Sequence, residues 1–92
     1  MYFAIFATDR PDSTELRLQT RSTHREYLRD MAAHPEVIVI HGGPTLAEDE
    51  ETMNGSMMIV EAPSLAAAKV FSVGDTYRRA GQFAACEVRP WA

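Results

Sequence analysis

His24 and Asp75 are the two residues of this chain whose side chains best suit proton transfer. An imidazole changes its charge near neutral pH, so it can either accept or donate a proton there. A carboxylate bonded to one ring nitrogen fixes the tautomer and leaves the other nitrogen for a substrate. Asp75 falls in a predicted link between a helix and a strand, where a rigid scaffold commonly displays functional side chains. A His24–Asp75 pair is therefore our candidate acid–base group, if the chain folds so that the two meet.

His24 belongs to a predicted helix that begins near residue 13 and ends near Ala33. Residues spaced three or four apart lie on one face of that helix. They are Leu16, Thr20, Thr23, Tyr27 and Met31. A second line lies beside it and contains Arg17, Arg21, His24 and Leu28. This position predicts that His24 lies at the boundary between core and solvent, where an imidazole is partly shielded from water yet within reach of a ligand.

Arg17 and Arg21 precede His24 by two turns and one turn of the helix. Either guanidinium has the geometry to hold a carboxylate or another anion through paired hydrogen bonds. The alternative is an ordinary solvated helix face on which Glu15 and Glu26 are their partners.

Four further residues are candidates for lining a ligand pocket. Gly43 and Pro44 follow a predicted strand, and the glycines there allow positive φ and a close approach of the backbone to a ligand. Ser56 and Tyr77 carry hydroxyl groups that can contact a substrate. A plain turn, a structural serine and a packed tyrosine ring are the alternatives.

Metal and nucleotide cofactors are not expected. His24, His41 and Asp75 offer three metal-ligating side chains, but the chain has no His-x₃-His or Cys-x₂-Cys spacing. It also has no phosphate-binding glycine loop and no dinucleotide fingerprint. His34, which precedes Pro35, is interpreted as a surface residue of a loop.

Composition limits the class of protein. The net charge of −4 argues against nucleic acid as a partner, because binding to phosphates requires a concentrated basic face. The apolar N-terminal segment is too short to span a membrane, so no membrane association is expected. The single cysteine, Cys86, cannot form an internal disulfide and is typical of a reducing compartment, so we expect a cytoplasmic protein.

The order of elements predicts one α+β domain over residues 1–92. Strands are predicted at 2–8, 37–40, 56–61 and 82–89, and helices at 13–33 and 64–71. Gly42-Gly43-Pro44 is expected to end the second strand, and Asn54-Gly55 is expected to form a turn. The βαββαβ order is that of the ferredoxin-like fold, a four-stranded antiparallel sheet with two helices on one face.

The predicted strands are too apolar for a sheet with one face in water. Successive residues are apolar in three of them, at Phe3–Phe6, Val37–Ile40 and Met57–Val60. Two helices cover only one face, and a strand with one wet face normally alternates apolar and polar residues. An open second face would expose an unusually large apolar patch. We therefore expect a homodimer in which two sheets pack face to face about a two-fold axis.

The chain resembles the YciI-like, or YCII-related, family from end to end. The matching residues are Tyr2-Phe3, Ile5-Phe6-Ala7, Asp9, Pro11, Arg17, Arg21, His24, Gly43-Pro44, Gly55-Ser56, Ala67-Ala68-Lys69, Asp75, Tyr77, Ala80-Gly81 and Pro90-Trp91. The resemblance implies the dimeric α+β barrel form of the ferredoxin-like fold. In that family a helix histidine and the aspartate of an Asp-Pro-Tyr motif form a proposed active-site dyad, which implies the same role for His24 and Asp75. This chain has Thr76 at the position of the proline.

Two functions follow as hypotheses. The first is a small cytoplasmic enzyme in which His24 and Asp75 perform an elimination or isomerisation on a small aromatic or enolic acid. One branch of the family that this chain resembles is similar to a dehydrochlorinase that acts on chlorinated hydroxyquinols. The alternative is a dimeric module of the same fold that binds a small molecule without turning it over.

Overall fold

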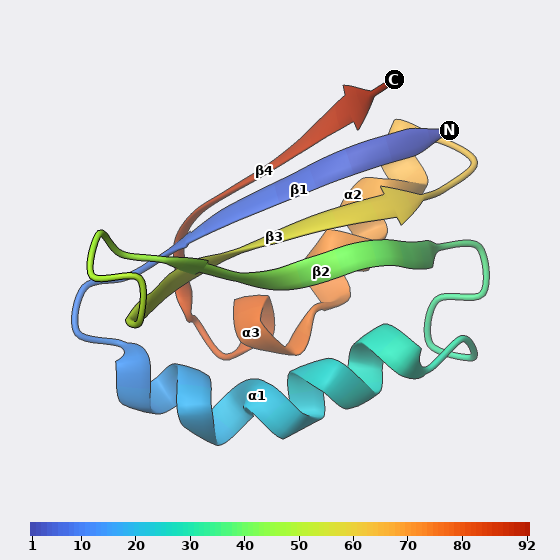
Figure 1. Ribbon diagram of the computed structural model, residues 1–92. Coiled ribbons are helices and arrows are strands. Elements are labelled where there is room, and N and C mark those ends of the chain that lie inside the picture. Colours follow the sequence, from blue (N-terminus) through green and yellow to red (C-terminus); the bar gives the residue numbers. More distant parts are fainter.

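Residues 1–92 are described by a computed structural model in which a long helix, α1, crosses one side of a four-stranded sheet (Figure 1). The elements are β1 (Tyr2–Asp9), α1 (Thr14–Arg29), β2 (Ile38–Leu46), β3 (Met53–Glu61), α2 (Leu65–Gly74), α3 (Thr76–Arg79) and β4 (Phe83–Trp91). This is the predicted βαββαβ order with one short addition, α3. Both chain termini lie at the same end of the sheet (Figure 1).

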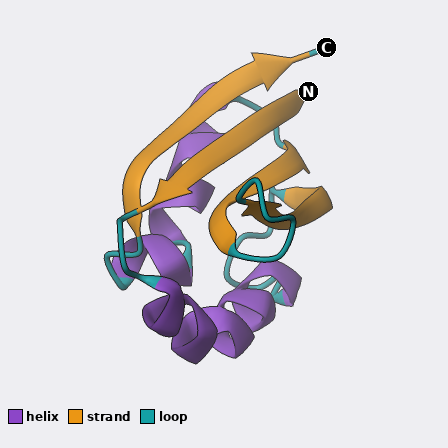
Figure 2. Ribbon diagram, turned by 60° about the vertical axis from the view of Figure 1, so that its left-hand side comes forward, coloured by secondary structure: helices purple, strands orange, loops and turns teal.

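The sheet has the strand order β2-β3-β1-β4, with every neighbouring pair antiparallel. Along the central strand β1, Phe3, Ile5 and Ala7 are buried and the residues between them are more exposed. The helices lie together on one side of the sheet (Figure 2). The core between sheet and helices contains Phe3, Ile5, Val37, Met58, Val60, Ala62, Ala68 and Phe71. The predicted ferredoxin-like fold class is confirmed.

The predicted end of α1 is wrong by one turn. The helix ends at Arg29 rather than near Ala33. Asp30 leaves helical geometry with ψ 89°, and its carboxylate accepts a hydrogen bond from the backbone of Ala32. The imidazole of His34 then folds back to the carbonyl of Tyr27, in the last turn of α1. Local side-chain hydrogen bonds of this kind compete with helix continuation.

The predicted turns on either side of the β2–β3 hairpin are also wrong. β2 continues through Gly42-Gly43-Pro44, whose glycines do not have positive φ, and β3 includes Asn54-Gly55. A side chain at Gly55 would collide with the carbonyl of Ala7, so glycine is required there by close packing of strands rather than by a turn.

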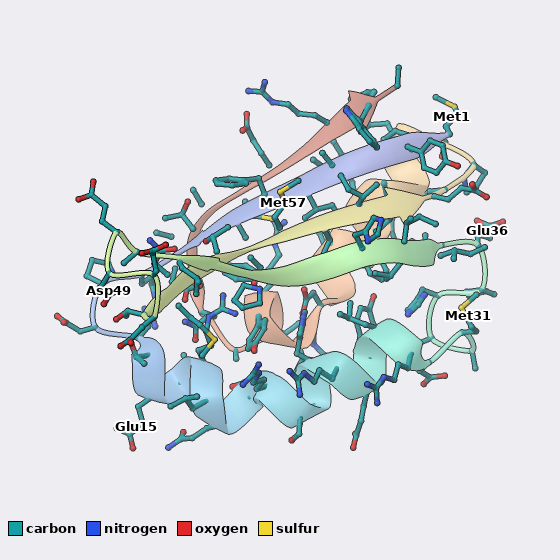
Figure 3. The ribbon with its side chains drawn as sticks, viewed as in Figure 1. Met1, Glu15, Met31, Glu36, Asp49 and Met57 are labelled. Carbon is teal, nitrogen blue, oxygen red and sulfur yellow. The ribbon has the colours of Figure 1, made fainter.

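The turn itself lies at residues 47–52, around Asp49 (Figure 3). The carboxylate of Asp49 accepts hydrogen bonds from the hydroxyl and backbone N–H of Thr52 and from the backbone N–H of Glu51. These bonds lower the pKa of Asp49 to about 2. An aspartate that bonds its own loop in this way is a common turn-forming residue, so the hairpin turn is made by Asp49 rather than by a glycine pair.

The sheet face that points away from the helices carries several large apolar side chains and is uncovered in the single chain, with the charged Glu87 and Arg89 on its β4 side. Its exposed large side chains are Tyr2, Phe6, Ile38, Met57 and Trp91. Met57 is marked on the sheet in Figure 3, and it lies directly beside Phe6 on the neighbouring strand. The expectation of apolar residues on both faces is therefore met, and pairing of this face with a second copy remains a prediction. No helix of the chain has the length and apolar character needed to cross a lipid bilayer.

Candidate active site

The structure brings His24 and Asp75 together, although they are 51 residues apart in the sequence. Nδ1 of His24 lies 2.6 Å from Oδ1 of Asp75, and the two side chains are 10% and 2% exposed. A carboxylate oxygen accepts, so Nδ1 carries the proton and Nε2 is left as the free ring nitrogen. Nε2 makes no hydrogen bond within the chain. This is the arrangement expected of a histidine whose tautomer is fixed for proton transfer.

Asp75 is held by the junction of α2 and α3. The residue closes α2 and also caps the start of α3, where its Oδ1 accepts a hydrogen bond of 3.0 Å from the backbone N–H of Tyr77. Its backbone is extended, with φ −58° and ψ 133°. This is the conformation that a following proline would favour. Thr76 therefore leaves the aspartate in the geometry that the family's proline would impose.

Arg17 is buried and already paired, which differs from the expected role of an open anion-binding group. Its Nε and Nη2 donate to the two carboxylate oxygens of Asp9, each at 2.7 Å, and the two side chains are 2% and 5% exposed. Burial alone would lower the pKa of Arg17, but the hydrogen bond and charge of Asp9 outweigh it and raise the pKa. The guanidinium also interacts with the hydroxyl of Tyr77, and this contact adds to the rise in the pKa of Arg17.

Ser56 connects this ion pair to a cavity. Nη2 of Arg17 donates to Oγ of Ser56 at 2.9 Å, so the serine oxygen is an acceptor on that side. The hydroxyl proton of Ser56 has no acceptor within the chain. A hydroxyl that accepts from a cation becomes a better donor, because hydrogen bonds in a chain polarise one another. Asp9, Arg17 and Ser56 thus form a buried network whose last donor is free.

Tyr77 packs between the two polar networks. Its ring is stacked on His24, with centroids 4.1 Å apart, and the guanidinium carbon of Arg17 lies 4.5 Å from the same centroid. Burial raises the pKa of Tyr77, although the charges of Arg17 and Arg21 oppose that change. The phenol is therefore neutral at physiological pH. Tyr77 orients the imidazole by stacking, as the packing alternative for this residue anticipated.

These groups surround one small cavity of about 140 Å³ between α1 and the strands β2 and β3. It is lined by Arg17, Arg21, His24, Arg25, Leu28, Gly42, Gly43, Pro44, Met53, Ser56, Met58 and Tyr77. A cavity of about 150 Å³ in an engineered protein holds one benzene molecule, so a ligand with a single ring matches this volume. No carboxylate lines the cavity, because Asp9 and Asp75 lie behind Arg17 and His24.

All the residues predicted to bind substrate line this cavity, namely Arg17, Arg21, Gly43, Pro44, Ser56 and Tyr77. Sequence reasoning missed Asp9 as the partner of Arg17, and it missed Arg25 and the apolar wall of Leu28, Met53 and Met58. Arg25 continues the four-residue spacing of Arg17 and Arg21, so the sequence carried a signal for it. The contact with Asp9 depends on how β1 leads into α1 and had no such signal.

His41, considered earlier as a metal ligand, does not join His24 and Asp75. It pairs with Ile59 across β2 and β3, on the sheet face that points away from the helices. No group of three or more histidine, cysteine, aspartate or glutamate side chains is arranged to hold a metal ion.

The whole chain, residues 1–92, matches the model of the YCII-related domain. The chain belongs to the YCII-related family. One relative, the protein YciI of Escherichia coli, is 33% identical over 99% of this chain and 96% of its own length.

Two solved structures extend the comparison. The 5-chloro-2-hydroxyhydroquinone dehydrochlorinase TftG from Burkholderia phenoliruptrix, in complex with 2,5-dihydroxybenzoquinone, is 34% identical. Its TM-score is 0.82, and the match covers 100% of this chain and 94% of TftG. A dimeric protein of unknown function with a ferredoxin-like fold from Bacteroides fragilis is 17% identical, with a TM-score of 0.57 and coverage of 98% and 94%. This second likeness concerns the fold alone.

Proposed function

We propose that this YCII-related protein is a small cytoplasmic enzyme that moves a proton in an elimination or isomerisation of a small aromatic or enolic acid. The observation that carries the proposal is the hydrogen bond of 2.6 Å between Nδ1 of His24 and Oδ1 of Asp75, beside a cavity of about 140 Å³. No organic cofactor is required for such a reaction, because the chain supplies an acid–base group and hydrogen-bond donors at one place.

In the proposed reaction His24 acts first as a general base. Nε2 takes a proton from a carbon or hydroxyl of the substrate, and the electron pair moves onto a substrate oxygen to give an enolate or phenolate. Asp75 stabilises the imidazolium that forms, since its carboxylate accepts the hydrogen bond from Nδ1. General acid–base assistance of this kind is typically worth about 10²–10⁴ in rate.

The developing oxyanion needs donors, and the Arg17–Ser56 network is suited to supply them. The hydroxyl proton of Ser56 has no acceptor within the chain, and Ser56 and the charged guanidinium of Arg17 both line the cavity. Asp9 holds the guanidinium in place through two hydrogen bonds before any substrate arrives. Donors fixed in advance cost no reorganisation as charge develops on the substrate oxygen.

The oxyanion then collapses in one of two ways. In an elimination the electron pair on oxygen re-forms the carbonyl, the enolate double bond shifts to the neighbouring saturated carbon, and the leaving group on that carbon departs as an anion. The proton stays on His24 for release to water. In an isomerisation the imidazolium returns the proton to a different atom of the same substrate. The name of TftG, a dehydrochlorinase, supports the elimination rather than the isomerisation.

A substrate panel followed by NMR tests this function. It contains 5-chloro-2-hydroxyhydroquinone, hydroxybenzoates and enol lactones, each incubated with the purified protein in deuterated buffer. We expect solvent deuterium to enter a substrate, or an anion to be released, with the wild-type protein and not with His24→Gln. His41→Gln changes a histidine on the far face of the sheet and should leave turnover intact. Equal turnover by His24→Gln and the wild-type protein would overturn the proposed mechanism.

We also propose that the chain forms a homodimer through the open sheet face. The exposed side chains of Phe6 and Met57 adjoin at its centre, and they are 50% and 46% exposed in the single chain. The dimeric ferredoxin-like protein from Bacteroides fragilis supports the proposal through its fold. Sedimentation equilibrium should give a dimer for the wild-type chain and a monomer for Phe6→Glu. Leu18→Glu, on an exposed position of α1, should remain dimeric. A monomeric wild-type chain would contradict the proposal.

A further inference from the structure

Two arginines at the cavity have no counterion within the chain. Arg21 and Arg25 line the cavity, yet neither forms a salt bridge or a side-chain hydrogen bond. The chain has three side-chain ion pairs in all, and the only cavity arginine among them is Arg17. The protein as a whole has a net charge of −4. A site lined by three arginines and no carboxylate is therefore unusual within this chain.

The three arginines form a graded series along α1. Arg17 is buried, Arg21 is partly exposed and Arg25 is exposed. Residues four apart on a helix lie on one face, about 6 Å further along the axis. Arg21 and Arg25 also border a shallow groove on the outer surface of α1, which puts them at the rim of the cavity. The charge compensated by Asp9 thus lies inside, and the two uncompensated charges lie at the entrance.

We infer that the substrate of this site carries a carboxylate that is separate from its reacting oxygen, and that Arg21 and Arg25 bind that carboxylate at the rim. This inference rests on the proposed function, in which Arg17 and Ser56 hold the reacting oxygen. It names the substrate class as a single-ring or enolic hydroxy acid, rather than an uncharged hydroquinone.

The cavity volume and the charges agree with this class. The cavity of about 140 Å³ is open on one side and matches the volume of one ring, so a substituent of a ring seated in it can extend to the rim. Guanidinium groups bind carboxylates through paired hydrogen bonds, which fix orientation as well as charge. A carboxylate at the rim would direct the opposite edge of the ring towards His24 and Ser56.

A matched pair of ligands tests the inference without requiring turnover. Hydroquinone and gentisate differ by one ring carboxylate, and titration calorimetry measures their dissociation constants. We expect gentisate to bind the wild-type protein at least about tenfold more tightly. The preference should disappear in the double variant Arg21→Gln/Arg25→Gln. It should also weaken with added salt, because the rim charges are exposed to solvent.

Arg78→Gln is the matched control, since it removes the same charge from an exposed position of α3 that lines neither the cavity nor the groove. It should keep the preference for gentisate. Equal affinity of the wild-type protein for the two ligands would overturn the inference, as would a preference that survives in the double variant.

Failure of the proposed function would look different. In that case the preference for gentisate would persist in wild-type protein, while His24→Gln and wild type would turn over the substrate panel equally.

Discussion

The two buried histidines of this protein, one within α1 and one in the loop that follows it, have different hydrogen-bond environments. His24 and His34 are 8% and 5% exposed. Each stacks or packs against a tyrosine of its neighbourhood, Tyr77 for His24 and Tyr27 for His34. At His24 one ring nitrogen bonds a carboxylate and the other is free beside a cavity.

At His34 both ring nitrogens face backbone carbonyl oxygens, of which a neutral imidazole donates to only one. Nδ1 lies 3.0 Å from the carbonyl oxygen of Val37, and Nε2 lies 2.6 Å from that of Tyr27. These contacts tie the end of α1 to the start of β2, and the edge of the ring packs on Phe71 of α2. Burial alone therefore does not distinguish a catalytic histidine from a structural one. The free nitrogen at a cavity and the carboxylate partner distinguish them.

The largest effect in this comparison is expected from Asp75→Asn. Asparagine keeps an acceptor for the backbone N–H of Tyr77, so α3 stays capped, but it removes the charge that stabilises an imidazolium at His24. We expect turnover to fall by about 10²–10⁴ with little change in substrate affinity. Nitrogen-15 NMR of the imidazole should show the Nδ1–H tautomer in the neutral wild-type ring and a mixture in the variant. Undiminished turnover would show that Asp75 is a cap and nothing more.

His34→Ala should act on stability instead of rate. The change leaves the buried carbonyls of Tyr27 and Val37 without the imidazole, and it removes a ring that packs on Phe71. We expect the free energy of unfolding to fall by about 2–4 kcal/mol in urea denaturation. Glu26→Ala, which alters an exposed side chain of α1 away from the sheet, should change it by less than about 0.5 kcal/mol. A fall in turnover per folded molecule of His34→Ala would contradict the structural role.

Tyr27 and Tyr77, the tyrosines that pack on the two histidines, can be compared through the pH dependence of protein stability. Burial raises the pKa of both Tyr27 and Tyr77 above the ordinary value of about 10. A group whose pKa is higher in the folded state adds stability below its unfolded pKa, and this is lost as pH rises through the folded pKa. The wild-type protein should therefore lose stability above about pH 10, and either Tyr→Phe variant should lose less there.

At neutral pH these variants should differ. The hydroxyl of Tyr27 donates to the carbonyl of Phe71 at 2.9 Å, so Tyr27→Phe should cost about 1 kcal/mol. No acceptor within the chain is bonded to the hydroxyl of Tyr77, and Tyr77→Phe should cost less. Urea denaturation from about pH 7 to about pH 12 measures both effects. Equal costs at neutral pH would mean that the contact between the hydroxyl of Tyr77 and Arg17 stabilises the fold as much as the hydrogen bond of Tyr27 does.

The sequence predicted the strand and helix order because β-branched runs and helical spacing are local signals. It failed at the boundaries where a side chain from elsewhere intervenes. His34 was interpreted as a loop surface residue beside Pro35, but its ring ends α1 by bonding Tyr27. Gly55 was interpreted as part of a turn, but it is required by the approach of the Ala7 carbonyl on the neighbouring strand. Neither contact has a signature in the local sequence.

The residues of the candidate site also divide into those that a local sequence pattern predicts and those that it does not. Residues on one helix face, such as Arg17, Arg21 and His24, are related by a fixed spacing and were predicted together. Asp75 was linked to His24 through family resemblance as well as topology, because residue types alone do not specify a contact across 51 positions. The pairing of Arg17 with Asp9 was missed, and that pairing moves Arg17 from anion binding at the entrance to support of Ser56 inside the cavity.

The smallest effect concerns Thr76, which follows the dyad aspartate. Thr76 is the first residue of α3, a position that suits proline, and Asp75 already has the extended ψ of 133° that precedes proline. Thr76→Pro should therefore stabilise the protein by about 0.4–1 kcal/mol, because it restricts the unfolded chain without altering the native geometry. Thr23→Pro, within α1, is the contrasting control and should destabilise by about 3 kcal/mol or more. Thermal unfolding measures both. A destabilised Thr76→Pro that also loses turnover would mean that the threonine, through its hydroxyl contact with the carbonyl of Thr23, has taken over the positioning of Asp75.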